Sequence, residues 1–398
     1  MISTDKEKIN DLLSRGVEEI IDREHLKKRL LTGEKLRVKL GIDPTSSEIH
    51  LGNAVVLWKL KELRDLGHQA VFLIGDFTAK IGDPSGRLLA RRPLTDEEIR
   101  KNMATYKKQV AKILDLDKIE IRYNSEWLGK MKSNEIFSLT QLISLNKILE
   151  REDFSKRLAE HRPIGMHELL YPLFQAYDSV ILKADLEIGG QDQLLNMLIA
   201  REIQKKFSQK PQDVIAFSLL EGLDGLRKMS KSYNNYIGIT FKPNEMFGKI
   251  MSIPDNLIIK YFTLCTRVSL QEINEMAEAI KKGANPRDFK AKLAREIVKI
   301  YHDEKAATSA EKEFNKIFQK KELPSEMPVI KLPATSDKLP NLLVKLKLAP
   351  SKSEAQRLIK QGAVTISGQV EKDWKKEIKI KSGIIIRVGK RKFVKIKV

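Results

Sequence analysis

Cysteine is nearly absent from this sequence of 398 residues, which contains only Cys265. One cysteine excludes an internal disulfide framework and any metal site built from several thiolates, and its apolar neighbours predict a buried thiol. Long apolar runs are missing too, since none approaches the ~18 residues of a membrane span. Residues 1–7 include acidic and polar side chains where a signal peptide has an apolar stretch. We therefore expect a cytoplasmic protein that does not enter a membrane.

Acidic residues are the scarcer charged type, because 53 aspartates and glutamates stand against 73 lysines and arginines, for a net charge of +20. The excess is concentrated in residues 331–398, which contain 18 basic and 5 acidic side chains and so have a net charge of +13. Such a segment is either a solvated basic surface or a surface for phosphate groups. Composition alone leaves both interpretations open.

The pattern of apolar residues predicts an α/β fold. Residues 36–43 have the pattern of a strand, residues 52–66 that of a helix, and residues 69–75 are a nearly continuous apolar run, typical of a strand buried on both faces. Together they predict a βαβ unit. Further strands are predicted at residues 119–122, 185–188 and 214–217. This alternation favours a Rossmann-like, doubly wound parallel sheet, which binds ligands beyond the carboxyl ends of its strands.

Other segments have different patterns, and they predict how the chain divides into domains. Residues 242–323 are mostly helical in pattern, with Ser269 and Asn285 as N-caps of helices over residues 270–282 and 286–301. The length predicts two or three domains. We expect a catalytic domain at 1–236 with a helical insertion at about 125–165, an all-helical domain at 237–325, a linker at 326–337 and a small α+β RNA-binding domain at 338–398.

The basic end of the chain has a regular pattern of its own. Ser351 is a plausible N-cap for a helix that ends at Gln361, and Gly362 follows as its stop. Short basic strands come next. A helix with several cations before such strands favours a compact RNA-binding module over a structural cap. The cations that we expect to contact RNA are Lys352, Arg357, Lys360, Lys390 and Arg391.

The segment His50-Leu51-Gly52-Asn53 stands where the first predicted strand and loop lead into a helix. Alone, a histidine before a glycine is more often a helix-entry residue than a catalytic one. At this position, however, the free N–H groups of a helix N-terminus favour an anion, and Gly52 allows a nucleotide to approach the backbone. Thr45 and His50 are therefore candidate donors to phosphate oxygens.

A second motif, Lys228-Met229-Ser230-Lys231-Ser232, lies in a polar loop after Gly222 and Gly225. Taken alone, it is an ordinary solvated basic loop. Two lysines three positions apart on a mobile loop are also able to close over a triphosphate and neutralise the charge that develops at the α-phosphorus. Thr45, His50, Lys228 and Lys231 are thus the candidate catalytic groups.

Three polar residues share one face of a predicted helix. Tyr171, Gln175 and Asp178 are spaced by four and three positions, and a core helix would present apolar side chains on that face. The spacing therefore indicates a lined pocket. By contrast, the turn at Asp83 and the residue Asp192 after two glycines are each explained, in isolation, by ordinary turn and cap chemistry.

The two motifs together resemble the class I aminoacyl-tRNA synthetases, and over nearly its whole length the chain is similar to the bacterial tyrosyl-tRNA synthetases. The end of the chain also resembles a small RNA-binding fold named after a ribosomal small-subunit protein. The matching segments are Gly41-Ile42-Asp43-Pro44-Thr45, Ile81-Gly82-Asp83-Pro84-Ser85-Gly86-Arg87, Tyr171-Pro172-Leu173-Phe174-Gln175-Ala176-Tyr177-Asp178 and Gly189-Gly190-Gln191-Asp192-Gln193.

The resemblance implies a tyrosine–tRNA ligase that forms tyrosyl-adenylate from L-tyrosine and ATP with magnesium and then charges tRNA-Tyr. It implies a homodimer that meets through the insertion, and neither a tightly bound cofactor nor a resident metal. Asp83, Tyr171 and Gln175 would hold the α-ammonium group and Asp178 the phenol hydroxyl. The remaining residues implied are Gly41 and Gln193 for tyrosine, Asp43, Gly52, Asn53, Gly190, Asp192, Met229 and Ser232 for ATP, and Arg87 and Arg91 for pyrophosphate.

The chain departs from the family pattern at three positions. Lys39 replaces a tyrosine that contacts the substrate hydroxyl, Leu40 replaces a cysteine that contacts the ribose, and Asn53 replaces a second histidine. Three other functions stay open at this stage: a tryptophanyl-type synthetase, a non-catalytic RNA-binding relative and a small-metabolite adenylyltransferase. Amino-acid-dependent pyrophosphate exchange and tRNA charging distinguish them.

Overall fold

The computed structural model describes residues 2–85, 94–318, 327–333, 335–389 and 392–398. The chain forms two compact units, residues 1–307 and 308–398. Among the described residues, no helix has both the length and the apolar character needed to cross a membrane. Cys265 is buried as predicted, and burial raises the pKa of its thiol to about 12.

A sheet that has six strands within the described residues forms the centre of the first unit, in the order β1-β6-β5-β2-β3-β4. The strands from β6 to β4 run parallel, which confirms the predicted doubly wound sheet. The edge strand β1, which the sequence pattern did not indicate, pairs antiparallel with β6. The strands are β1 (Val17–Ile21), β2 (Arg37–Ile42), β3 (Gln69–Ile74), β4 (Glu120–Tyr123), β5 (Leu186–Gly190) and β6 (Asp213–Phe217).

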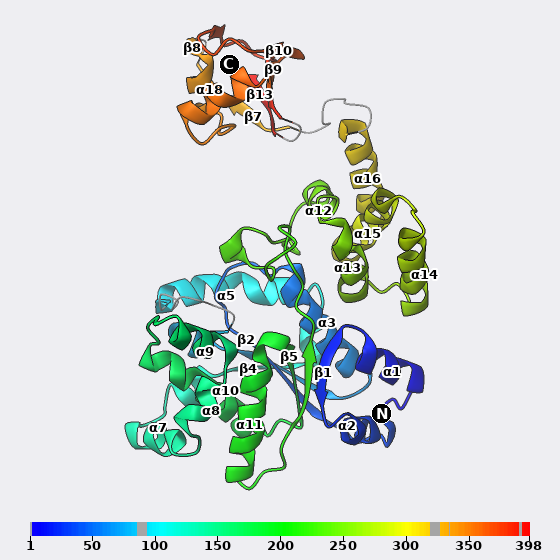
Figure 1. Cartoon of the computed structure of the whole chain (residues 1–398), viewed down its shortest axis with the longest axis vertical. Coiled ribbons are helices and arrows are strands. Elements are labelled where there is room, and N and C mark those ends of the chain that lie inside the picture. The colour runs from blue at the N-terminus through cyan, green and yellow to red at the C-terminus, as the bar shows by residue number, and fades with distance from the viewer. Residues whose placement is uncertain (1, 86–93, 319–326, 334, 390–391) are drawn as a thin grey trace. The chain divides into compact units, whose positions relative to one another are not determined.

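Right-handed crossovers decide which face of the sheet each helix covers. The chain moves from β2 through β3 to β4 in one direction and then returns to β5 and β6 in the other. Its connecting helices therefore cover both faces (Figure 1). One face has α3 (Leu51–Asp65) and α5 (Asp96–Val110), and the other has α10 (Met166–Leu182) and α11 (Leu194–Lys206). The direction in which successive strands are added to the sheet reverses between β2 and β5, and such sheets bind their ligands at this point.

Strands β3, β5 and β6 are mostly buried because helices cover both of their faces. In β3 every residue after Gln69 is buried, and all of β6 is buried. Each fully buried valine, isoleucine or phenylalanine stabilises the fold by about 1.5–3 kcal/mol relative to exposure. Lys39 in β2, Glu187 in β5 and Asp213 at the start of β6 are exceptions in this layer, since all three are charged and buried. Helices α1 (Lys6–Ser14), α2 (Arg23–Leu31) and α4 (Thr78–Ile81) complete this part.

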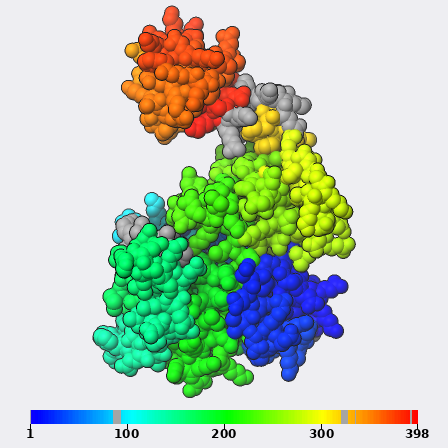
Figure 2. Space-filling model, viewed as in Figure 1, coloured from blue at the N-terminus to red at the C-terminus, as the bar shows by residue number. Residues whose placement is uncertain are grey.

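The expected insertion is helical and lies between β4 and α10. Its buried residues Leu139, Ile148 and Phe154 pack with Leu173 and Phe174 of α10, so one apolar cluster joins the insertion to the sheet's covering helix. Figure 2 shows the insertion, in teal, at the surface of the first unit. Its helices are α6 (Ser125–Leu128), α7 (Ser133–Thr140), α8 (Leu145–Leu149) and α9 (Glu152–Ala159).

Helices follow the sheet, and their predicted caps are confirmed. The Ser269 side chain accepts the N–H of Glu272, and the Asn285 side chain accepts the N–H of Arg287. Most of this helical segment belongs to the same compact unit as the sheet. The predicted domain boundaries at residues 236 and 325 stay predictions. The helices are α12 (Pro243–Ile250), α13 (Ile258–Cys265), α14 (Leu270–Lys281), α15 (Pro286–Tyr301) and α16 (Glu304–Phe318).

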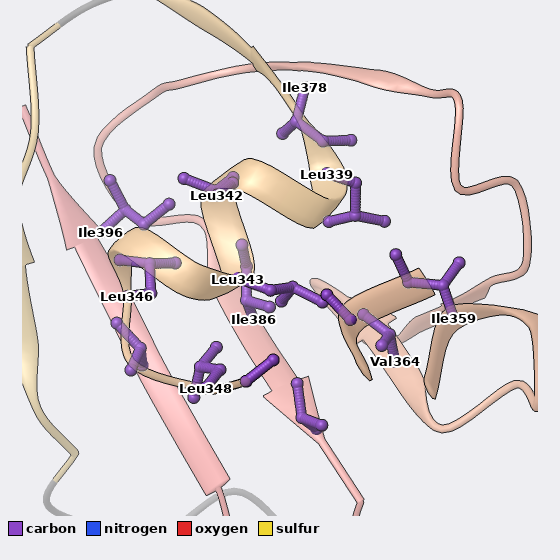
Figure 3. Close-up of a cluster of buried hydrophobic side chains, with 14 of the residues drawn as sticks. Leu339, Leu342, Leu343, Leu346, Leu348, Ile359, Val364, Ile378, Ile386 and Ile396 are labelled. Atoms are coloured by element: carbon purple, nitrogen blue, oxygen red, sulfur yellow. The ribbon is translucent and has the colours of Figure 1, made fainter. Parts of the chain in front are cut away.

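In the described part of the second unit, helices over residues 339–345 and 352–360 pack around one buried cluster (Figure 3). Ser351 caps α18 and Gly362 follows it with a positive φ, as predicted. Residues 326–337, expected as a linker, instead include one strand and most of a second, which pair with later strands, and Ile330 and Leu332 pack against the buried cluster. The elements are α17 (Leu339–Lys345), α18 (Lys352–Lys360), β7 (Val329–Lys331), β8 (Ser336–Lys338), β9 (Val364–Ile366), β10 (Gln369–Glu371), β11 (Glu377–Lys379), β12 (Ile385–Val388) and β13 (Lys392–Lys397).

Candidate active site

A cavity of about 270 Å³ opens at the carboxyl ends of β2 and β5, where the direction of the sheet reverses. Residues from both sequence motifs and from the polar face of α10 line it together. A second, smaller cavity of about 190 Å³ adjoins it and is lined by Thr45, His50, Lys231 and Ser232, among others. The structure therefore brings together segments that lie far apart in the sequence.

His50 is both the N-cap of α3 and part of the cavity lining. Its Nδ1 accepts the N–H of Asn53, and the Asn53 side-chain oxygen accepts the N–H of His50. Burial, together with the charge of Lys228, lowers the pKa of His50 to about 4. The ring is therefore neutral at pH 7, and because Nδ1 is an acceptor, the proton is on Nε2. His50 thus offers one N–H donor, and Asn53 keeps its amide NH₂ group available.

The loop between β2 and α3 is held by α5, a contact that the sequence did not indicate. Gln109 of α5 accepts the N–H of Ile49 and donates to the carbonyl of Ser47. Asn102 donates to the carbonyl of Pro44 at 2.9 Å. These bonds fix the backbone on both sides of Thr45 and so determine where its hydroxyl lies.

The segment that follows the second motif pairs with the residues around His50. The carbonyl of Ile237 accepts the N–H of Leu51, and the N–H of Ile239 donates to the carbonyl of Ile49. Lys228 Nζ lies 2.6 Å from a carboxylate oxygen of Asp192. Lys231 Nζ is more exposed and lies 3.4 Å from Ser47 Oγ. Both lysines therefore face the mouth of the cavity that His50 lines.

Acidic side chains define the inner part of the cavity. The hydroxyl of Tyr171 donates to Asp43, and so does the hydroxyl of Thr78. Burial, reinforced by the nearby charges of Asp83 and Asp178, raises the pKa of Asp43 to about 7 despite these hydrogen bonds. Burial also raises the pKa of Tyr171 well above its usual value. The lone pairs of the Tyr171 oxygen stay available to a cationic ligand, because its proton is directed at Asp43.

Asp178 lies at the end of the cavity beneath the insertion. Its two carboxylate oxygens accept hydrogen bonds from Trp127 Nε1 at 2.8 Å and from Asn124 Nδ2 at 3.3 Å. Burial raises its pKa to about 7, while the charge of Lys39 and these two hydrogen bonds lower it. Asp178 is thus a buried acceptor that is close to its titration point at neutral pH.

At the other end, Asp83 belongs to a network that was also not visible in the sequence. Gln193 Nε2 donates to Asp83 at 2.7 Å, and the Gln193 side-chain oxygen accepts from Asn196. Arg151 of the insertion reaches into this network and donates to Asn196 and to Ser85. Arg151 and Asn196 are both buried, so they fix the turn around Asp83.

Lys39 is almost completely buried and forms an ion pair in the cavity lining. Its Nζ lies 2.9 Å from a carboxylate oxygen of Glu187 and also donates to Ser179 and to the carbonyl of Gln175. Gln175 is thereby held between Lys39 and Asn196, whose amide donates to its side-chain oxygen. A lysine inside a strand gives no local signal of such a pair, because Glu187 lies on a different strand.

Most of the residues that the sequence singled out for the substrates line these two cavities. Arg87 and Arg91 lie outside the described residues, as do Lys390 and Arg391. The other three cations expected to bind RNA are on α18 of the second unit. The residues that line the first cavity include Gly41, Asp43, Thr45, His50, Gly52, Asn53, Asp83, Tyr171, Gln175, Asp178, Gly190, Asp192, Gln193, Lys228 and Met229, while Lys231 and Ser232 line the second.

Comparison with known proteins agrees with this geometry. Residues 31–319 match a family model described as tRNA synthetases class I (W and Y), and residues 319–396 match the tyrosine–tRNA ligase SYY-like C-terminal domain. The tyrosine–tRNA ligase of Carboxydothermus hydrogenoformans is 49% identical over 397 residues, covering 97% of each chain. That of Thermotoga maritima is 48% identical and covers 97% of this chain and 96% of its own.

Solved structures are similar as well. A tyrosyl-tRNA synthetase from Archaeoglobus fulgidus, complexed with L-tyrosine, is 26% identical with a TM-score of 0.61 and covers 77% of this chain and 99% of its own. A truncated mitochondrial tyrosyl-tRNA synthetase from Aspergillus nidulans shares the fold at a TM-score of 0.64 and 22% identity, over 78% of this chain and 94% of its own. The parallel sheet, the two converging motifs and these relatives together show that the chain belongs to the tyrosine–tRNA ligases of the class I tRNA synthetases.

Proposed function

We propose that this chain activates L-tyrosine with ATP to form tyrosyl-adenylate and then transfers the tyrosyl group to the 3′ end of tRNA-Tyr. One observation carries the proposal: His50 lines two adjoining cavities, one shared with Lys228, Tyr171 and Asp178 and the other with Lys231. The lysines suit a triphosphate at the mouth, and the acidic interior suits the ammonium group of an amino acid.

In the first step, a carboxylate oxygen of tyrosine attacks the α-phosphorus of ATP. A new O–P bond forms while the bond from the α-phosphorus to the bridging oxygen breaks, and pyrophosphate leaves with that electron pair. No protein nucleophile is needed, so the rate depends on positioning and on charge stabilisation. Thr45 and the Nε2–H of His50 are the proposed neutral donors to the phosphates, and Lys228 and Lys231 are the proposed cations.

The nucleotide is proposed to lie over Gly52 and Gly190. Asp192 is the proposed acceptor for a ribose hydroxyl, which would exchange with its present partner Lys228 and release that lysine toward phosphate. In the described residues no group of three His, Cys, Asp or Glu side chains is arranged to hold a metal ion. We therefore propose that magnesium enters as the complex with ATP, as part of the substrate.

The amino acid is proposed to lie between Asp83 and Asp178. Its α-ammonium group would donate to Asp83 and to the oxygens of Tyr171 and Gln175, while its phenol hydroxyl would donate to Asp178. A buried carboxylate matched to a hydroxyl is left without that donor when phenylalanine enters the pocket. Such sites reject the analogue by a factor of ~10⁵, a magnitude for which the tyrosine enzyme is itself the standard example.

In the second step, a ribose hydroxyl of the terminal adenosine of tRNA attacks the carbonyl carbon of the tyrosyl group. The bond from that carbon to the phosphate oxygen breaks, AMP leaves with that electron pair, and the hydroxyl proton is released. The basic second unit supports the RNA part of this proposal through Lys352, Arg357 and Lys360, which share the short helix α18. We place the reaction in the cytoplasm, where tRNA charging serves translation.

A homodimer is the proposed assembly. Four of the large exposed apolar side chains, Phe137, Leu145, Leu158 and Met166, lie in or beside the insertion. Phe137 is 70% exposed and Met166 is 76% exposed. Exposed apolar side chains grouped in one segment are typical of a protein interface. A second copy of the same segment is the partner we propose for them.

ATP–pyrophosphate exchange with each amino acid in turn tests the proposed function. Exchange with tyrosine, followed by charging of tRNA-Tyr, is the expected result. Exchange that depends on tryptophan would point to the related tryptophan enzymes, and exchange without tRNA charging would indicate an adenylyltransferase. No amino-acid-dependent exchange by folded protein would leave only an RNA-binding role.

A further inference from the structure

The pair formed by Lys39 and Glu187 lies at the centre of the sheet, next to the proposed tyrosine pocket. The two residues are direct neighbours in the parallel register of β2 and β5. Their side chains are 1% and 3% exposed, and 2.9 Å separates the lysine nitrogen from the nearer carboxylate oxygen. Desolvating two charges costs several kcal/mol per ion, so an ion pair in this position needs full compensation by its neighbours.

The neighbours of the pair provide that compensation. The three donors of Lys39 have three acceptors: Glu187, the Ser179 hydroxyl at 2.8 Å and the Gln175 carbonyl at 3.0 Å. Glu187 in turn accepts from Ser179, from the side-chain amide of Gln175 and from Gln212. Gln175 is therefore bound to the pair through both its main chain and its side chain.

Two pocket residues on α10 depend on this arrangement. Gln175 is one of them, and Asp178 lies one turn later on the same helix and faces the same cavity. The charged and titratable groups around Asp178 in the described residues are Lys39 on β2, Glu187 on β5, and Asp43 and Tyr171 at the pocket wall. Of these, Lys39 is the cation.

We propose that Lys39 is a positioning and specificity residue for tyrosine: paired with Glu187, it holds Gln175 in place and keeps Asp178 a carboxylate that can accept the phenol hydroxyl. This inference rests on the proposed function of the pocket. Because all three donors of Lys39 are used within the protein, Lys39 acts through Asp178 and Gln175 and does not take over the direct hydroxyl contact of the tyrosine found in relatives.

Two single variants separate this role from a purely structural one. Lys39→Met removes the cation beside Asp178, so the pKa of Asp178 should rise, and the acid limb of kcat/KM for tyrosine should move up by about one pH unit. Glu187→Gln removes the anion and leaves the cation, so the same limb should move down. Loss of packing alone does not shift a pH profile in opposite directions.

The measurement is ATP–pyrophosphate exchange between pH 5.5 and 8.5, with L-phenylalanine as a competitive inhibitor that lacks the hydroxyl. At pH 7, Lys39→Met should raise the KM for tyrosine about tenfold and leave the KM for ATP within about twofold. The inhibition constant of phenylalanine should change much less, because phenylalanine makes no bond to Asp178. Lys59→Met is the matched control, since Lys59 is also buried and paired, with Glu62, but does not line the cavity.

The outcomes decide the proposal. Equal weakening of tyrosine and phenylalanine, or an acid limb that stays in place in both variants, would overturn it and leave the pair a structural one. If Lys39→Met does not fold, as judged by circular dichroism, Glu187→Gln carries the test alone: a downward shift supports the role and an unchanged limb refutes it. Failure of the proposed function is distinct, because the wild-type protein would then show no tyrosine-dependent exchange.

Discussion

Lys231 Nζ lies 3.4 Å from the hydroxyl of Ser47, although the two residues are 184 positions apart in the sequence. The contact joins the loop after β2 to the Lys228–Ser232 motif. Lys231 also lies 3.8 Å from Glu48, an exposed pair that contributes little to stability. Its position at the mouth of the cavity is therefore better explained by a ligand than by the fold.

Replacing Lys231 by alanine should slow tyrosine activation. The lysine would stabilise charge that develops in the transition state, and removal of one such group costs about 10²–10³ in kcat. Tyrosine binding at equilibrium should change by less than about twofold, because Lys231 does not line the inner cavity. Lys281→Ala on the exposed surface of α14 is the control and should be without effect. Equal losses in rate and in tyrosine affinity would contradict the assignment.

Asp192 should matter for ATP and not for tyrosine. Asp192→Asn removes the negative partner of Lys228, whose nitrogen is 2.6 Å away, and also weakens the proposed acceptor for the ribose. A hydrogen bond to a charged group contributes about 1.5–3 kcal/mol, so the KM for ATP should rise by about 10- to 100-fold. Exchange kinetics with one substrate varied at a time provide the measurement. An increase confined to the KM for tyrosine would place Asp192 in the other half of the site.

Local signals in the sequence were sufficient for much of the fold. The N-caps Ser269, Asn285 and Ser351 begin helices where the pattern predicts them. A cap is predictable because its hydrogen bond joins a side chain to a backbone N–H only two or three residues later. The parallel strands are also predicted from the sequence, with β3 as a nearly continuous apolar run. The edge strand β1 was missed, because only its pairing with β6 selects an extended conformation for Val-Glu-Glu-Ile-Ile.

The site residues that belong to short motifs are predictable from the sequence. The residues that support them from distant parts of the chain are not. His50 and Lys228 belong to short motifs, and the structure places them at one cavity. Arg151 and Asn196 belong to no motif, and their hydrogen bond joins the insertion to α11. The sequence marks Lys39 only as a departure from the family pattern. Its partner Glu187 became evident from the register of β2 and β5, which no local pattern encodes.

Placing a charge on the exposed apolar face of the insertion should separate the proposed dimer. Phe137→Asp combined with Met166→Asp would place two carboxylates of each chain in that interface. Burying a carboxylate that has no pairing cation or hydrogen-bond donor costs free energy, so association should weaken. Sedimentation velocity should then show a monomer in place of a dimer. Val370→Asp, at a 58% exposed apolar position in the second unit, is the control. Wild-type protein that sediments as a monomer would refute the proposed dimer. A double variant that still sediments as a dimer would show that the interface lies in another part of the molecule.

Removing residues 319–398 should weaken tRNA binding and spare tyrosine activation. The cut belongs after Phe318, the end of α16, because a cut near residue 330 would divide β7, which pairs with β13 in the second unit's sheet. The log of full-length affinity for tRNA should fall with the log of salt concentration by roughly 0.7 to 0.9 per phosphate contact, and the truncated chain should give a shallower slope. Tyrosine-dependent pyrophosphate exchange should stay within about twofold of wild type, since the cavity residues all precede Phe318. Equal salt slopes for the two proteins would mean that the cations of α18 do not contact the RNA.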